Sequence, residues 1–203
     1  MAAEPATIDT NSADIGTNFH IRDVTITVEG ITPYSQSAHT GEDKEKSETW
    51  DDYEARIWRK KAHTLPSGEM FVPGSAFKLC LDEAIQNLNE KIGGKGNQTW
   101  SGVFRMGLAP MSDMLLGVKI DECMSERVFC HSNGKRGPGT RVNRLFPILH
   151  RWGGTVTLRI FNDNITQEKF EEFFTKAGLI AGIGRGRPST GCPNGLGRFR
   201  PVR

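Results

Sequence analysis

Residues 70–84 read MFVPGSAFKLCLDEA, and they decide how the rest of the chain is interpreted. From this stretch onward, apolar residues recur at intervals of three and four, which is the spacing of one helix face. Ser75 is a typical residue for a helix N-cap, and Gly93 followed by Gly94 is a typical stop. The sequence therefore predicts a helix from Ser75 to just before Gly93. Its apolar stripe consists of Phe77, Cys80, Leu81, Ala84, Ile85, Leu88 and Ile92.

Strand and helix patterns follow on both sides of this helix. Alternating apolar and polar residues predict strands over residues 20–29, 114–120 and 155–161, with shorter ones near 103–108 and 198–202. A helical turn or two is expected over 52–61, and a second long helix from a cap at Thr166 to a stop at Gly178. The order is strand, helix, strand, long insertion, strand, helix, strand. This order predicts an α+β fold of the ferredoxin-like type, βαββαβ, with a basic insertion between the central strands.

The domain organisation is expected to be simple. We expect residues 1–19 to be a disordered lead-in. Residues 20–203 are expected to form a single domain, with an acidic loop at 41–54 and a basic insertion at 123–152. The composition is 36% hydrophobic, and no run approaches the roughly 18 apolar residues that a membrane span needs. The four cysteines are too irregularly spaced for a disulfide framework. We therefore expect a soluble protein in a reducing, cytoplasmic compartment.

The formal charge of +2 conceals a strong asymmetry along the chain. Residues 1–54 carry twelve acids and three bases, a balance of −9, so the remainder carries +11. Two stretches, residues 127–151 and 176–203, each hold six bases and no acid. Asymmetry of this kind indicates contact with nucleic acid, or an acidic segment that masks a basic face.

Six glycines between positions 182 and 197 form a loop whose backbone N–H groups can approach a phosphate closely. The loop lacks the Gly-Lys-Ser/Thr of a P-loop, and no strand precedes it as a dinucleotide fingerprint requires. Arginines in the loop favour contact with a nucleic-acid backbone. The alternative is a turn-rich loop with solvated arginines. The residues expected to bind are Gly184, Arg185, Arg187, Arg198 and Arg200.

The insertion interleaves bases with aromatic side chains, a combination that suits single-stranded nucleic acid. His131 and Phe146 are the candidates for stacking on bases. The alternative is an ordinary loop whose apolar residues pack on the core. The candidates for phosphate contact are Arg127, Lys135, Arg136, Arg141 and Arg144.

Two segments together resemble the RAMP superfamily, whose members are RNA-binding subunits of CRISPR effector complexes. Residues 70–84 look like its IPGSSLKG-x-LR signature, and residues 182–199 are similar to its glycine-rich loop. The signature's glycine and arginine are Leu79 and Asp82 here, which departs from the pattern. The resemblance implies a modified RNA-recognition fold and a thumb-like insertion. It also implies guide-RNA phosphate contacts at Gly74, Ser75 and Lys78.

No catalytic residue is favoured. The resemblance implies two kinds of RNA-cutting relative, one that uses an aspartate after the first strand and one that uses a histidine. The matching residues are Asp43, His39 and His63, and for each a surface or packing role is the favoured interpretation. No metal or cofactor is expected, because no Cys-x-x-Cys occurs. The rejected zinc ligands are Cys123, Cys130, His131 and Cys192.

The sequence thus predicts a protein that binds single-stranded RNA or a guide RNA through phosphate contacts without cutting it. It would act as a backbone-type subunit of a CRISPR-like ribonucleoprotein, or be a short or phage-borne relative of one. The expected partners are RNA, with DNA as the alternative, and other protein subunits or further copies of this chain, but no membrane. Two other functions stay open: a metal-independent endoribonuclease of the guide-processing type, and a phage-encoded mimic that occupies a CRISPR subunit interface.

Overall fold

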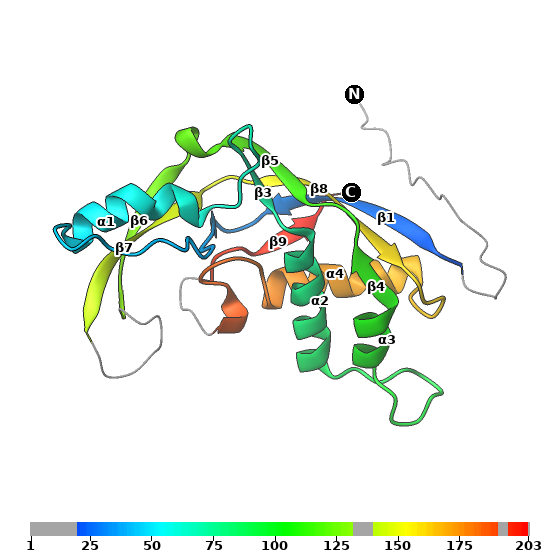
Figure 1. Ribbon diagram of the computed structural model, residues 1–203. Helices are drawn as coiled ribbons and strands as arrows, with labels where there is room; N and C mark the ends of the chain where they lie inside the picture. Colours follow the sequence, from blue (N-terminus) through cyan, green and yellow to red (C-terminus); the bar gives the residue numbers. More distant parts are fainter. Residues whose placement is uncertain (1–19, 132–139, 191–194, 203) are drawn as a thin grey trace.

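The computed structural model describes residues 20–131, 140–190 and 195–202, apart from the side chain of His131. The predicted lead-in at 1–19 lies outside the described residues. The described chain forms a mixed α/β fold with antiparallel sheets (Figure 1). Within it, no helix is both long enough and apolar enough to cross a membrane.

A four-stranded antiparallel sheet forms the centre of the molecule, in the order β4-β8-β1-β9. The buried side chains of Val24, Ile26 and Val28 alternate with exposed ones, as predicted for a half-buried strand. The strands expected near 20–29 and 155–161 are confirmed. The four strands are β1 (Arg22–Gly30), β4 (Leu108–Pro110), β8 (Gly153–Ile160) and β9 (Phe199–Pro201).

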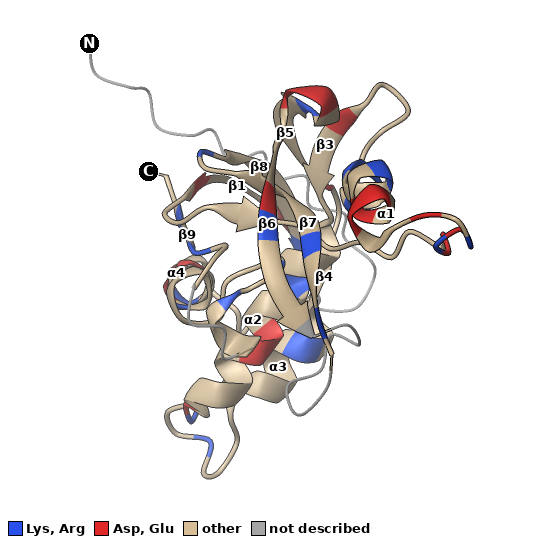
Figure 2. Cartoon of the chain, turned by 90° about the vertical axis from the view of Figure 1, so that its left-hand side faces the viewer, with Lys and Arg blue, Asp and Glu red and all other residues tan. Residues whose placement is uncertain are grey.

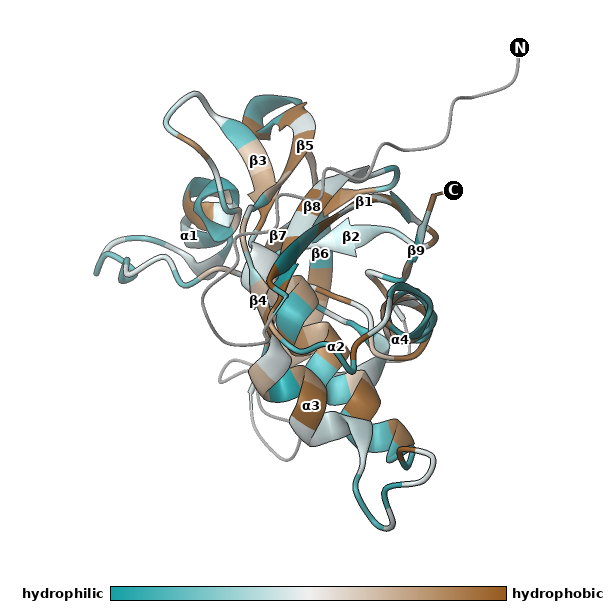
Figure 3. Ribbon diagram, turned by 90° about the vertical axis from the view of Figure 1, so that its right-hand side faces the viewer, coloured by the Kyte–Doolittle hydropathy of each residue, from teal (hydrophilic) through white to brown (hydrophobic). Residues whose placement is uncertain are grey.

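Helices α2 (Gly74–Leu88) and α4 (Gln167–Ile180) cover one face of this sheet, with the shorter α3 (Trp100–Gly107) beside them (Figures 1 and 3). The apolar stripe of α2 faces α4 and β9. The ring of Phe77 lies 6.1 Å from that of Phe174 and 5.4 Å from that of Phe199, measured between centroids. Burial of these large rings supplies much of the free energy that holds the helices on the sheet. This arrangement is compatible with a ferredoxin-like or RNA-recognition fold.

The ends of α2 differ from the sequence prediction. Pro73 is in the cap position, so Ser75 lies inside the helix and is not its N-cap. The helix ends at Asn89, four residues before Gly93. Asn89 adopts the left-handed conformation (φ 49°) of a helix C-cap. Asparagine tolerates this conformation better than most residues do.

The predictions for residues 103–108 and for the end of α4 were wrong. Residues 103–108 were predicted as a strand but mostly form the end of α3. This short apolar stretch suits either period, and packing of Phe104 on Phe173 of α4, at 5.1 Å between ring centroids, selects the helix. α4 runs through Gly178 instead of stopping there. A Cβ at Gly178 would lie 2.3 Å from the backbone oxygen of Phe199, so the glycine serves contact with β9.

The segment predicted as a basic insertion contains strands β6 and β7, which pair as an antiparallel hairpin in a second sheet of the order β2-β7-β6. Helix α1 and the 3-10 turn η1 pack on β7 and confirm the helical turns predicted over 52–61. Strands β3 and β5 form a separate pair, which confirms the strand predicted over 114–120. The bounds are β2 (Tyr34–Ser35), α1 (Trp50–Ile57), η1 (Trp58–Lys61), β3 (Glu69–Val72), β5 (Met114–Lys119), η2 (Ile120–Glu122), β6 (Met124–His131), β7 (Arg141–Leu149) and η3 (Pro188–Thr190).

Candidate functional site

A cleft of about 450 Å³ lies between the start of α2, strand β2 and the glycine-rich loop. Residues that are far apart in the sequence meet there. Ser75 comes from the start of α2, Arg187 from the loop, and His63 from the connection between η1 and β3. Three features that the sequence predicted separately therefore line one cavity. The lining also includes Gln36, Leu79, Glu83, Gly184 and Arg185.

The first backbone amide of α2 is already occupied. The N–H of Gly74 donates to Oδ1 of Asp113, 2.9 Å away, on the turn between β4 and β5. Asp113 thus caps the helix in place of Ser75, and its negative charge suits the positive end of the helix dipole. A phosphate at this end would lie beside a carboxylate, so the structure disfavours the predicted contact at Gly74. Ser75 is exposed at the rim of the cleft.

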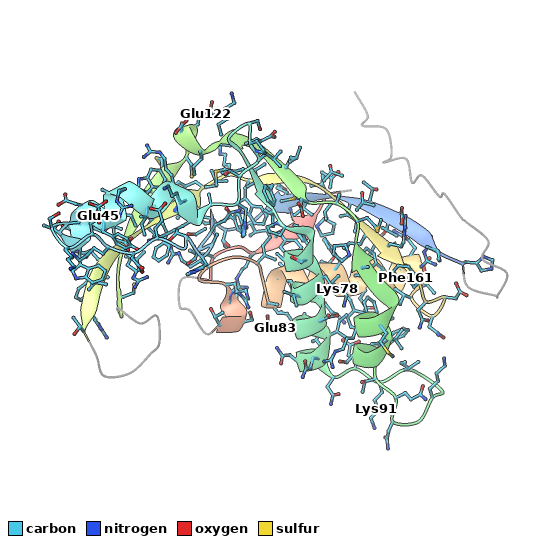
Figure 4. The ribbon with its side chains drawn as sticks, in the orientation of Figure 1. Glu45, Lys78, Glu83, Lys91, Glu122 and Phe161 are labelled. Carbon is cyan, nitrogen blue, oxygen red and sulfur yellow. The ribbon has the colours of Figure 1, made fainter. Side chains whose placement is uncertain are left out.

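Lys78 does not face the cleft. Its Nζ donates to Oδ1 of Asp82 at 2.6 Å and to the backbone oxygen of Arg105 at 3.2 Å. Only 13% of its side chain is exposed. Figure 4 shows Lys78 and Glu83 on opposite sides of α2, with Lys78 toward α3. Lys78, the lysine of the signature, therefore joins α2 to α3. Its partner on α2 is Asp82, which stands where the signature has an arginine.

Close packing explains two glycines of the loop. Gly184 has a φ of +78°, and a Cβ there would lie 2.5 Å from both the backbone oxygen of Ser35 and the ring of Tyr34. Gly197 has a φ of +70°, and its Cβ would lie 1.8 Å from the oxygen of Ile183. Only glycine fits these positions. The loop is thus folded against β2 and on itself.

Some backbone donors of the loop have no acceptor within the described part of the chain, and two of the residues that carry them, Gly184 and Arg187, line the cleft. Among the residues that the structure describes, none accepts from the backbone N–H groups of Gly184, Gly186 or Arg187. The guanidinium Nε of Arg187 donates to Ser189 at 3.0 Å and lies 3.6 Å from a carboxylate oxygen of Glu83. With 38% of its side chain exposed, Arg187 is accessible from solvent. Its guanidinium and the loop amides are the groups best placed to hold an anion.

Arg185 connects the glycine-rich loop to the β6–β7 hairpin. Its guanidinium donates to Oγ of Ser35 at 3.0 Å and to Glu126 of β6 at 2.6 Å. It also lies 4.2 Å from the ring centroid of Phe146, and Nζ of Lys61 lies 4.5 Å from the same centroid. Phe146 is buried, at 6% exposure, which agrees with the packing alternative and not with stacking on bases.

The last two arginines predicted as ligands lie away from the cleft lining. Arg198 donates from its guanidinium to the backbone oxygen of Leu179 at 2.6 Å, near the end of α4. Arg200 pairs with Glu29 at 2.8 Å across strands β9 and β1. Both contacts fasten the C-terminal strand to the sheet and the helix. Neither residue joins Arg187 at the cleft.

The bases of the hairpin are spread along it. Arg127 lies 3.6 Å from Asp51 of α1, and both side chains are more than half exposed. Arg141 is exposed at the start of β7, and Arg144 is half-buried in the same strand. Lys135, Arg136 and the side chain of His131 lie outside the described residues. No described residue of β6 or β7 lines the cleft, so Arg127, Arg141 and Arg144 lie apart from it.

His63 is the predicted catalytic candidate that the structure brings to the cleft. Its backbone N–H donates to Oε1 of Gln36 at 2.7 Å, and its ring lies 5.6 Å from that of Phe71. Burial lowers the pKa of His63 below its ordinary value, and the negative charge of Asp113 only partly opposes this. The imidazole is therefore neutral near pH 7. His39 is exposed outside the cleft.

The acidic segment is largely neutralised by bases of its own neighbourhood. Arg56 of α1 pairs with Glu42 at 2.7 Å and with Glu48 at 2.8 Å, and Lys60 also bonds to Glu42. Acidic and basic side chains accordingly alternate over α1 and the preceding loop (Figure 2). The backbone oxygen of Asp43 joins this network. The segment therefore folds on α1, and the carboxylates of Glu42 and Glu48 are engaged there.

Sequence reasoning missed a buried ion pair between Glu54 and Lys61. The side chains are 4% and 5% exposed. The carboxylate accepts from the N–H of Leu145 at 2.8 Å, and Nζ of Lys61 donates to the oxygen of the same residue at 2.9 Å. The pair thus connects the backbone of β7 to α1 through hydrogen bonds. No spacing signal could have found it, because the charges lie seven residues apart on a helix and the turn that follows it.

The cysteines indicate no reactive or metal centre in the described part of the chain. Cys80 lies under α4, and burial raises its pKa to about 12, so the thiol stays protonated. Three or more His, Cys, Asp or Glu side chains that could hold a metal ion do not cluster among the residues described. Cys192 lies outside them.

The sequence matches no family model and no curated protein. Its fold is similar to that of several solved structures. A chain of the type III-B Cmr-beta complex bound to cognate target RNA gives a TM-score of 0.50 at 13% identity, covering 90% of this chain and 59% of that one. Cmr6 from Pyrococcus furiosus gives 0.48 at 13% identity, covering 90% and 99%. A Cas6 product complex gives 0.32 at 14% identity, covering 88% and 50%.

The Cmr-beta likeness shows a shared fold. At 13% identity it speaks to the fold alone, and this chain spans 59% of the protein it resembles. The shared fold extends over 90% of this chain.

Proposed function

We propose that this protein binds single-stranded RNA or a guide RNA without cutting it, as a backbone-type subunit of a CRISPR-like ribonucleoprotein. The observation that carries the proposal is the cleft. The signature at the start of α2 and the glycine-rich loop line one cavity, and the lining includes Gly184 and Arg187, whose backbone N–H groups have no acceptor among the described residues, together with the accessible guanidinium of Arg187. Backbone amides and arginine are the groups that hold RNA phosphates.

The proposal includes a finer assignment of the fold. β1, α2, β4, β8, α4 and β9 are the six elements of a βαββαβ domain over residues 20–203, and their sheet order supports this. The β6–β7 hairpin and the β3–β5 pair are additions to it. The hairpin, with exposed Arg127 and Arg141, would project toward RNA as a thumb. Other subunits, or further copies of this chain, would follow along the same RNA.

Binding of a fluorescein-labelled single-stranded RNA, followed by anisotropy, tests the proposal. We expect the affinity to fall with salt by about 0.7 logarithmic units per decade of salt for each phosphate contact. Arg187→Ala should weaken binding and make this slope shallower. Lys91→Ala removes the same charge at the far end of α2 and should change little (Figure 4). Equal losses in both variants would mean that the RNA binds elsewhere. A matched DNA strand distinguishes RNA from DNA as the ligand.

A metal-independent endoribonuclease is the second candidate, and His63 favours it. A neutral imidazole can take a proton from an RNA 2′-hydroxyl, and His63 lines the same cleft as Arg187. Incubation of labelled RNA with the protein in excess chelator tests this activity. Cleavage that disappears in His63→Ala and persists in His39→Ala would replace the non-catalytic proposal.

A further inference from the structure

Glu83 is a charge that phosphates would repel, and yet it lines the cleft. It lies on the side of α2 opposite Lys78 (Figure 4). Its carboxylate oxygen is 3.6 Å from Nε of Arg187, whereas the ion pair of Lys176 with Glu90 closes to 2.7 Å. The side chains of Glu83 and Arg187 are 35% and 38% exposed. The pair is therefore loose, and a ligand can reach both partners.

An exposed apolar side chain lies beside this pair. Leu79 precedes Glu83 by four residues on α2, so the two share a helix face. Leu79 also lines the cleft, and it is 65% exposed. An apolar surface next to a carboxylate and a guanidinium suits a planar ligand with a polar edge. A nucleobase has both properties.

The carboxylate restricts which base can bind. Ionised carboxylates accept hydrogen bonds and donate none. Guanine carries two adjacent donors, N1–H and the N2 amino group, on its Watson–Crick edge, and its O6 accepts from arginine. Adenine and cytosine place a ring-nitrogen lone pair beside their amino group, and uracil has one N–H between two carbonyl oxygens. Each of these three bases would turn a lone pair toward the carboxylate.

We propose that the cleft selects a guanine in the bound RNA. Glu83 accepts from N1–H and N2–H, Arg187 donates to O6, and Leu79 packs against the face of the ring. The inference rests on the proposed function, because the base is delivered by an RNA whose phosphate the loop amides hold. It explains why an acidic residue is present in a site for a polyanion.

Anisotropy with labelled ten-residue oligouridylates tests the selection. One central position carries guanine, adenine, cytosine, uracil or hypoxanthine. We expect guanine to bind about tenfold more tightly than adenine or cytosine, and hypoxanthine, which lacks the N2 amino group, to lie between them. Glu83→Gln should remove the preference for guanine, measured as the ratio of the affinities for the guanine strand and the all-uracil strand. Glu90→Gln, which neutralises a carboxylate paired with Lys176, is the matched control.

The outcomes separate the two proposals. Equal affinity of the wild-type protein for all five strands would overturn guanine selection and leave RNA binding intact. A guanine preference that survives in Glu83→Gln would overturn the role of this carboxylate. Absence of binding to every strand would overturn the proposed function, and the selection with it. The hypoxanthine comparison uses only the wild-type protein, so the inference does not depend on how a variant folds.

Discussion

Replacing Glu54 by glutamine removes one charge from the buried pair that joins α1 to strand β7. Breaking a buried ion pair destabilises a protein by about 3–5 kcal/mol, because the remaining charge stays without a partner. Burial already lowers the pKa of Lys61, so the lysine can lose its proton, which reduces the penalty. We therefore expect Glu54→Gln to lower the free energy of unfolding by about 3 kcal/mol. Equilibrium urea unfolding, followed by far-UV circular dichroism, measures it.

The double variant Glu54→Leu/Lys61→Met tests whether the pair stabilises the protein through its hydrogen bonds to the backbone of β7. Replacing both partners of a buried pair by apolar residues is often neutral or stabilising. Here the N–H and the oxygen of Leu145 would both lose their partners, and each unsatisfied group costs about 1–3 kcal/mol. We expect the double variant to remain at least about 2 kcal/mol less stable than wild type. A double variant as stable as wild type would refute the reasoning. Glu29→Gln, which breaks an exposed pair, should change stability by less than about 1 kcal/mol.

Three further predictions concern the loop, the cleft histidine and the cap of α2. Gly197→Ala should prevent stable folding or lower the unfolding midpoint strongly, because its Cβ would overlap a carbonyl oxygen, whereas Gly93→Ala has open space and should be tolerated in the same urea titration. The pKa of His63 is near 6.5 in the unfolded state, and burial lowers it in the folded state. The unfolded state therefore binds more protons, and the stability of the protein falls as the pH drops through 6.5. Unfolding measured at pH 7.5 and at pH 5 should show a smaller fall in stability for His63→Asn than for wild type or for His39→Asn. Asp113→Asn keeps an acceptor for the first amide of α2 but removes its charge, so RNA binding by anisotropy should strengthen, and weaker binding would contradict the site.

The periodic parts of the sequence predicted the corresponding structure well. Alternation in β1 and the apolar stripe of α2 report burial on one face, which the backbone period enforces locally. The end of α3 was predicted as a strand because a short apolar stretch carries no decisive period, and contact with Phe173 selected the helix. Asp113 was missed as a cap for a related reason. It reaches Gly74 through the pairing of β3 with β5, a tertiary contact that local spacing does not encode.

The charge pattern predicted where bases are concentrated but not which of them are free. Arg185 and Lys78, both expected at phosphates, are held by Glu126 and Asp82, and Arg200 is held by Glu29.

Each such pair lowers the expected number of phosphate contacts. A basic side chain that stays with its carboxylate partner neutralises no phosphate and displaces no counterion from the RNA. Under the proposed function, recognition at the cleft would depend more on neutral loop amides and on Arg187 than on the sum of charges. The salt slope of binding should accordingly correspond to a few phosphate contacts, well below the twelve bases of the two acid-free stretches. A slope that accounted for all twelve would mean that RNA displaces these internal ion pairs, and that the cleft is only the start of a larger surface.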